Sequence, residues 1–357
     1  MPEPETEVLP YLTEGLPGTG GELKQTPEDF IVEEIPVYAP SGEGDHLFLW
    51  VEKRDVSAQF LVKVLSEQLR VDSREIGVAG LKDRCAITRQ MVSVPADCEP
   101  LLDGFAFEGI RILQATRHER KLKTGHLKGN RFTLLLKETT ENAFARANAI
   151  LERIKETGFP NYYGSQRMGR DNETLRMGMK LLKNEKVSAK YFRNKSLKRL
   201  ALSAAQSQLF NQALSQRVTD QSLHTVQQGD VMQVCESGGL FVVEDVSAEQ
   251  QRFDQRETVI TGPIFGPKMK QPTEKVLEAE TAILQEFSLE PAFFSRFKKL
   301  TPGARRPFLI WPEDLKISQA ADGIQFDFTL PSGVYATMLL REFMKNETAV
   351  MSPGDSL

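Results

Sequence analysis

The sequence has few cysteines and histidines, the residues from which disulfide frameworks and zinc sites are built. Its 357 residues include four histidines and three cysteines, Cys85, Cys98 and Cys235. An odd, sparse set of cysteines argues against a disulfide framework, and neither residue type shows the close spacing of metal ligands. We therefore expect reduced thiols, as in the cytoplasm, and no metal site.

Long hydrophobic runs and a basic leader are also missing. No apolar stretch approaches the about 20 residues that cross a bilayer. Residues 1–14 contain glutamates but no lysine or arginine, so they do not resemble a secretory signal. We expect a cytoplasmic protein without a membrane partner. The leader before Glu22 is rich in Pro, Gly and Glu, and we expect it to lack order.

The loops that mark common cofactor-dependent and hydrolytic enzymes are absent as well. The sequence has no Gly-Lys-Ser/Thr phosphate loop and no Gly-x-Ser-x-Gly turn, and no Gly-x-Gly-x-x-Gly follows a predicted strand. If the chain is an enzyme, we expect it to work without a cofactor.

Positive charge is concentrated in three stretches, although the formal net charge is −4. Each stretch by itself is typical of a solvated surface. Three of them in an acidic protein favour a groove that follows phosphates. The stretches are residues 117–131, 180–199 and 296–306.

The most distinctive stretch is residues 80–90, with Asp83 at its centre. Lys82 and Arg84 flank Asp83, and nearby positive charge favours the ionised form of a carboxylate, which can act as a nucleophile. Charged triplets also occur at ordinary solvated turns, so local composition leaves both interpretations open. A strand over 46–53, a helix capped by Asp55 or Ser57 and a strand over 88–94 are predicted around this loop.

Four motifs, in order, resemble those of the TruD family of tRNA pseudouridine synthases. The resemblance extends from about residue 24 to about residue 342, which is almost the whole chain. The motifs are Ala-Gly-Leu-Lys-Asp-Arg at 79–84 with Ala86, Thr88 and Gln90 after it, Lys-Gly-Asn-Arg-Phe at 128–132, Asn-Tyr-Tyr-Gly-Ser-Gln-Arg-Met-Gly at 161–169, and Leu-Pro-Ser-Gly-Val-Tyr-Ala-Thr at 330–337.

The resemblance implies an α/β fold of the α+β type. A pseudouridine-synthase-like catalytic domain with a mixed, largely antiparallel sheet would comprise residues 1–157 and 306–357, and a TruD-type α/β insertion domain, residues 158–305, would interrupt it. Alternation of apolar residues from Ile324 to Leu330 independently predicts a half-buried strand. We expect a turn at 331–333 to lead from it into a hairpin over 335–341.

The resemblance also implies isomerisation of uridine to pseudouridine at position 13 of tRNA. Asp83 would assist cleavage of the bond between base and ribose and reattachment through carbon. Lys24 would pair with Asp83 or with a phosphate. The implied substrate contacts are Lys24, Phe30, Asn130, Phe132 and Phe328, and the implied supports of the cleft are Lys82, Arg84, Asn161, Gln166 and Arg167.

More ordinary roles remain open for several of these residues. Lys24 can be a surface amine, and the three phenylalanines can be core residues. Two rival functions are a non-catalytic protein that binds or remodels RNA and a different metal-free enzyme that modifies or hydrolyses RNA. A pure binder gains nothing from a carboxylate that faces phosphates. We expect tRNA as the partner, no obligate protein partner, and a monomer.

Overall fold

The computed structural model describes residues 8–346, which belong to two compact units. We call the first the sheet unit; its described residues are 16–155, 312–336 and 343–346. We call the second the helical unit; its described residues are 8–15, 156–311 and 337–342. Each unit is therefore assembled from segments that lie far apart in the sequence.

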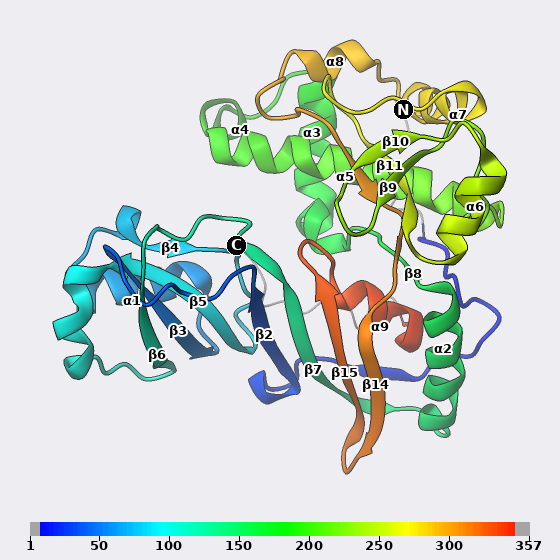
Figure 1. Ribbon diagram of the computed structural model, residues 1–357. Helices are drawn as coiled ribbons and strands as arrows, with labels where there is room; N and C mark the ends of the chain where they lie inside the picture. The colour runs from blue at the N-terminus through cyan, green and yellow to red at the C-terminus, as the bar shows by residue number, and fades with distance from the viewer. Residues whose placement is uncertain (1–7, 347–357) are drawn as a thin grey trace. The chain divides into compact units, whose positions relative to one another are not determined.

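The sheet unit is built on one nine-stranded sheet (Figure 1). Within the described residues, β2 (Phe30–Pro36) and β5 (Ile87–Pro95) form its one parallel pair and the other pairings are antiparallel, which confirms the mixed, largely antiparallel sheet. Two short strands, β1 (Gly20–Glu22) and β4 (Gly77–Val78), pair with β7 and β5. The remaining order is β14 (Glu313–Ala320), β15 (Gly323–Pro331), β7 (Leu127–Thr139), β2 (Phe30–Pro36), β5 (Ile87–Pro95), β3 (His46–Arg54), β6 (Ile110–His118).

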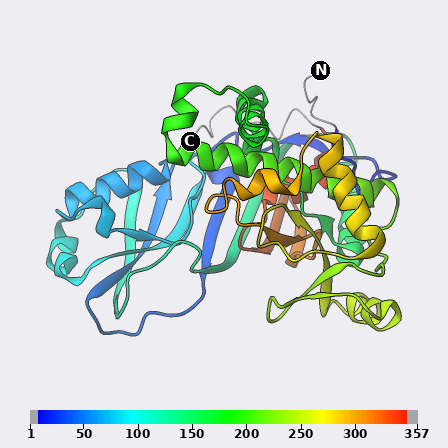
Figure 2. The ribbon, with the colours of Figure 1, turned by 90° about the horizontal axis from the view of Figure 1, so that it is seen from above.

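Helix α1 (Ala58–Gln68) covers one face of β3, β5 and β6 (Figure 2). Ser57 begins the helix, because its hydroxyl accepts the backbone N–H of Phe60 at 3.2 Å. Leu61 and Leu65 recur one turn apart and are fully buried against the inward side chains of the strands. The predicted strand–helix–strand arrangement around residues 46–94 is thus confirmed.

The predicted hairpin over 335–341 is wrong. Residues Ala336–Met344 form helix α9, in which Leu339, Leu340 and Phe343 are fully buried. The physical reason is that β15 already has β14 on one side and β7 on the other, so it offers no free edge to a further strand. The true hairpin partner of β15 is the preceding strand, β14.

The leader is ordered where the structure describes it, contrary to expectation. Thr13 donates its backbone N–H and its hydroxyl to the carboxylate of Glu342, at 3.0 and 2.7 Å, and is 3% exposed. The prediction for residues 1–7 lies outside the described residues. Long-range hydrogen bonds therefore order a segment whose composition suggested disorder.

The helical unit is organised around α5 (Lys195–Thr219) and a four-stranded sheet in the order β10-β9-β11-β12. Gly178 lets α3 (Glu173–Leu182) approach α5 closely, because a side chain there would overlap the carbonyl of Ala201. The strands are β9 (Val231–Val234), β10 (Leu240–Val242), β11 (Thr258–Ile264) and β12 (Ala304–Pro307), and a separate pair joins β8 (Phe159–Pro160) to β13 (Leu309–Ile310). The other helices of the chain are α2 (Ala143–Thr157), α3 (Glu173–Leu182), α4 (Ala189–Arg193), α6 (Val246–Asp254), α7 (Glu274–Glu286) and α8 (Pro291–Ser295).

One member of the third basic stretch does not face solvent. The Arg305 side chain is fully buried and makes a bidentate ion pair with Glu280 of α7, at 2.8 and 2.9 Å. It also donates to the carbonyl of Thr261 at 2.6 Å. Arg305 therefore fastens β12 to α7 and β11, which corrects its assignment to a phosphate-following surface.

None of the helices within residues 8–346 is both long enough and apolar enough to cross a bilayer.

Candidate active site

Asp83 lies on the loop between β4 and β5 of the sheet unit, and its side chain is 42% exposed. Its carboxylate oxygen Oδ2 is 2.9 Å from the ammonium of Lys24. Lys24 precedes the short 3₁₀ helix η1 (Pro27–Asp29), and its side chain is only 4% exposed. The ammonium of a nearly buried lysine thus lies against a solvent-accessible carboxylate. Of the two partners expected for Lys24, the structure has Asp83.

The backbone of Lys24 is in the left-handed region, with φ of 61°. This conformation costs a residue with a Cβ about 1 kcal/mol or more, and it persists where the surrounding structure requires it. Here it accompanies the ion pair of the ammonium with Asp83 and a position of the ammonium 4.3 Å from the centre of the Phe30 ring. The strained residue thus carries a fixed cation between a carboxylate and an aromatic face.

Three adjacent strands bring Phe30, Phe132 and Phe328 together. Phe132 lies directly opposite Phe328 in the β7–β15 register, and their rings stack at 5.2 Å with an angle of 24°. Phe30 meets Phe132 edge to face at 6.3 Å. Phe132 is 6% exposed, whereas the other two are at most 2% exposed. All three rings are therefore buried, Phe132 the least of them, and their role as substrate contacts stays a prediction.

Asn130 lies two residues before Phe132 on β7, so its side chain points to the same face of the sheet. Its oxygen Oδ1 is buried and has no hydrogen-bond partner in the described structure. Leaving a buried acceptor unsatisfied costs about 1–3 kcal/mol. A hydrogen bond from a ligand would satisfy this acceptor, and the role of Asn130 as a substrate contact stays a prediction.

Lys82 does not face Asp83. Its ammonium is 2.7 Å from the carboxylate of Glu34 on β2, and the two side chains are 6% and 1% exposed. Lys82, the sequence neighbour of Asp83, thus anchors the loop to the sheet, while Lys24 supplies the cation beside Asp83. Arg84 is largely exposed and lies 3.5 Å from a carboxylate oxygen of Asp55. These contacts correct the expectation that Lys82 adjusts the charge around Asp83.

The segment 161–169 belongs to the helical unit, where α5 holds it. Asn211 of α5 accepts the backbone N–H of Tyr163 and donates to its carbonyl, at 2.8 and 2.9 Å. Asn161 is 2% exposed and donates to the carbonyl of Pro307 at 2.9 Å, so it braces the segment from inside. Gln166 is exposed, and Arg167 borders a cavity on α5.

A family model described as tRNA pseudouridine synthase D (TruD) matches residues 7–192 and 186–343. The chain belongs to the TruD family. It is 40% identical over 344 residues to the tRNA pseudouridine synthase D of Thermus thermophilus, covering 96% of this chain and 93% of that one. The corresponding protein of Anaeromyxobacter dehalogenans is 37% identical over 349 residues, covering 97% and 99%.

The TruD fold is confirmed by a crystal structure from Methanosarcina mazei, described provisionally as tRNA pseudouridine synthase D. It superposes with a TM-score of 0.77 at 24% identity and covers 96% of this chain and 97% of that one. At 24% sequence identity, the superposition shows a shared fold, including the mixed α/β organisation around the sheet.

In this member of the TruD family, sequence reasoning missed Lys53. Lys53 is fully buried, and its ammonium donates to the backbone carbonyls of Asp83 and Val56, at 2.6 and 2.7 Å. The side chain therefore fixes the main chain at Asp83 itself. A signal was present, because Lys53 continues the inward-facing series of Leu47, Leu49 and Val51, where a lysine is unusual.

The sequence motif at 79–90 included Thr88 and Gln90 of β5 but suggested no role for either side chain. Thr88 lies opposite Val32, which lies opposite Phe132, so these side chains share one face of the sheet. Gln90 follows two residues later on the same face. Thr88 Oγ1 and Gln90 Oε1 are buried and have no hydrogen-bond partner in the described structure. Together with Asn130 on β7, these residues place three buried polar atoms without hydrogen-bond partners on two strands of the sheet.

Proposed function

We propose that this member of the TruD family isomerises uridine to pseudouridine in tRNA, at position 13. The reaction breaks the bond between C1′ of the ribose and N1 of the base and forms a bond from C1′ to C5. A proton leaves C5 and another is bound at N1, so the mass is unchanged. The observation that carries the proposal is an accessible carboxylate, Asp83, ion-paired at 2.9 Å with a buried lysine.

Asp83 is the proposed catalytic residue. Its charge serves attack on the sugar, attack on the ring and removal of a proton alike, since each of these steps needs an ionised carboxylate. Lys24 is ion-paired with the carboxylate, and Lys82 and Lys53 hold the loop through Glu34 and the Asp83 carbonyl. The proposal thus separates one reacting group from three groups that position it.

The base has to leave the RNA stack before its glycosidic bond can be reached. Phe132, the most accessible of the three clustered rings, is the proposed platform for the flipped base, supported by Phe30 and Phe328. Asn130 gives the directional hydrogen bond, since its buried Oδ1 has no partner among the described residues. Together these groups would hold the base against rotation until the bond is broken.

We assign recognition of the tRNA body to residues 158–305, the proposed TruD-type insertion domain, and to the basic stretches. Gln166 is exposed and Arg167 lines a cavity with other cations, which suits contact with phosphates. We propose that the chain acts as a monomer, so that tRNA and the purified protein suffice for the reaction.

The test is a single-turnover reaction of purified protein, in excess, with unmodified tRNA, followed by nucleotide-resolution mapping of pseudouridine. The parent should convert uridine 13. Asp83→Asn keeps the shape of the side chain but removes its charge, so it should remain folded, bind tRNA at least as well and form no pseudouridine.

Two results would contradict this proposal. One is near-normal conversion by Asp83→Asn. The other is tRNA binding by the parent without any conversion, which would instead support a non-catalytic protein that binds or remodels RNA. Lys63→Met, at an exposed lysine on α1, serves as a control variant that should convert uridine 13 like the parent.

A further inference from the structure

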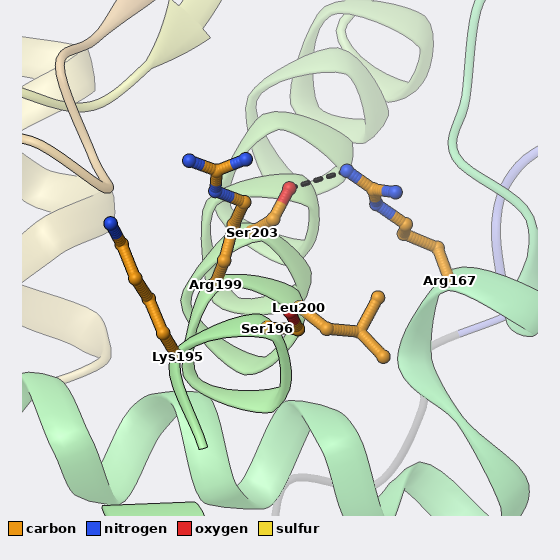
Figure 3. A pocket seen from close by; sticks show the side chains of 6 residues that line it. All are labelled: Arg167, Lys195, Ser196, Arg199, Leu200 and Ser203. Carbon is orange, nitrogen blue, oxygen red and sulfur yellow. Dashed lines mark hydrogen bonds between the residues drawn. The ribbon is translucent and has the colours of Figure 1, made fainter. Parts of the chain in front are cut away.

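A cavity of about 460 Å³ on α5 gathers three cations and two hydroxyl groups around one leucine (Figure 3). It lies entirely within the helical unit. None of the six lining residues carries a carboxylate, so the local charge favours an anion. The lining residues are Arg167, Lys195, Ser196, Arg199, Leu200 and Ser203.

Two of the cations, Lys195 and Arg199, lie on α5, where their mutual repulsion destabilises the helix. Lys195 and Arg199 are four residues apart, where like charges repel across one turn. Neither has an ion-pair partner among the residues that the structure describes. Ser196, Leu200 and Ser203 follow at intervals of four and three residues, so they line the same side of the helix. An anion bound between the two cations would offset this repulsion.

Arg167 approaches the cavity from the 3₁₀ turn η4 (Ser165–Met168) and is held in place before any ligand binds. Its Nη2 donates to the hydroxyl of Ser203, as the dashed line in Figure 3 shows. Its Nε is buried and has no hydrogen-bond partner in the described structure. The paired hydrogen bonds between Tyr163 and Asn211 fasten the preceding backbone to α5. The Ser203 hydroxyl accepts from Arg167 and still has its own hydrogen to donate.

We propose that this cavity binds one phosphate of the RNA backbone, so that it is a phosphate subsite for the tRNA substrate. The inference rests on the proposed function for the identity of the RNA. Cations on two elements can contact a phosphodiester from both sides, and Ser203 can donate to one of its oxygens. Leu200 adds an apolar surface suited to a ribose, which a free phosphate would not use.

The experiment compares the parent with Lys195→Ala/Arg199→Ala by measuring tRNA affinity over a series of salt concentrations. Both residues are exposed, so the double variant should keep the parent's thermal midpoint. The slope of log affinity against log salt should become shallower by about 1, because one phosphate contact is lost. Lys63→Ala/Arg70→Ala removes the same charge from exposed sites outside residues 158–305 and outside the basic stretches, so it should keep the parent's slope.

A third arm measures stabilisation of the parent and the double variant by inorganic phosphate. Stabilisation of the parent alone, with an unchanged tRNA slope in the double variant, would assign the cavity to a free anion and overturn the RNA subsite. An unchanged slope without phosphate binding would overturn it as well. Pseudouridine formation by the parent is scored separately, so a shallower slope with an inactive parent would contradict the proposed function and leave the subsite standing.

Discussion

At the scale of single residues, the loop at Asp83 is held by two buried lysines that contact different parts of it. Lys82 forms an ion pair with Glu34, and Lys53 donates a hydrogen bond to the carbonyl of Asp83. Burying an ammonium costs free energy unless it is paired or hydrogen-bonded, and both lysines meet that condition. The Asp83 loop is thus positioned by two side chains that are buried, Lys82 and Lys53.

The contact between Lys53 and the Asp83 carbonyl gives the first expectation. Lys53→Met keeps most of the buried stem and removes the donor, so the carbonyl of Asp83 is no longer fixed at 2.6 Å. A displacement of the reacting group by about 1 Å can lower the rate about 100-fold. We expect single-turnover conversion to fall by about that factor while tRNA affinity changes less than about twofold.

Stability and affinity distinguish positioning from a general structural role for Lys53. Urea unfolding at the assay temperature should show that Lys53→Met is folded, and raising the protein concentration should not restore the rate. Lys63→Met, on the exposed side of α1, is the matched control. A rate loss that disappears when more protein is added would count against positioning.

The Lys82–Glu34 pair gives the second expectation. Lys82→Ala leaves the Glu34 carboxylate, 1% exposed, without its cation. Removing one partner of a buried ion pair costs about 3–5 kcal/mol. We expect the urea midpoint of Lys82→Ala to fall accordingly, and the double variant Lys82→Met/Glu34→Gln to recover much of the loss. Equal stability of Lys82→Ala and the parent would show that the pair does not anchor the loop.

At the scale of elements, a buried ion pair joins β12 to α7. Arg305 is fully buried, and Glu280 is 8% exposed. Burial raises the pKa of Glu280 above its ordinary value of 4.5, and the charge of Arg305 acts in the opposite direction. The guanidinium is therefore what allows this carboxylate to remain inside the helical unit.

Arg305→Met gives the third expectation, which depends on pH. Without the guanidinium, we expect the loss of about 3–5 kcal/mol typical of a broken buried pair at pH 8, and a still higher pKa for Glu280. A carboxylate whose folded-state pKa is raised contributes stability below its unfolded value of 4.5, and that contribution is lost as pH rises through the folded-state pKa. The deficit should therefore be smaller at pH 5 than at pH 8.

Urea unfolding at the two pH values checks this expectation. The double variant Arg305→Met/Glu280→Gln has no carboxylate to titrate at position 280, so its difference from Arg305→Met should grow between pH 5 and pH 8. A deficit in Arg305→Met that is the same at both pH values would mean that Glu280 finds another cation or reaches solvent.

At the scale of the whole molecule, the two units are not separable pieces of chain. Residues Thr337–Glu342 follow the last strand of the sheet unit, yet they belong to the helical unit, where Met338, Leu339 and Leu340 are at most 4% exposed. Glu342 also holds Thr13 of the N-terminal segment. Removing the middle of the chain therefore exposes apolar side chains in α9.

A shortened variant that joins Lys155 to Pro312 through a flexible linker gives the fourth expectation. Burying three such side chains contributes about 1.5–3 kcal/mol each, and the variant loses that burial. We expect a lower urea midpoint than the parent's, together with loss of tRNA binding and turnover. The measurements are circular dichroism in urea and the single-turnover assay. Parent-like stability and activity would show that residues 156–311 are dispensable.

The sequence alone determined the local features of this protein. Apolar alternation predicted β15, and the strand patterns over 46–53 and 88–94, with a capped helix between them, predicted β3, β5 and α1. Burial on one face imposes such patterns wherever the element lies. Four ordered motifs identified the family. The position of Asp83 on a loop before β5 was also predictable, since the flanking strand patterns bracket it.

Only the tertiary structure decided which residues meet. Asp83 pairs with Lys24, 59 residues away, while its neighbour Lys82 turns to Glu34. Phe132 meets Phe328 because the β7–β15 register places them opposite each other, and residues 336–344 add no strand to β15 because both of its edges are occupied. Contacts of this kind depend on strand order and register, which are set by the packing of the whole sheet and not by any local stretch.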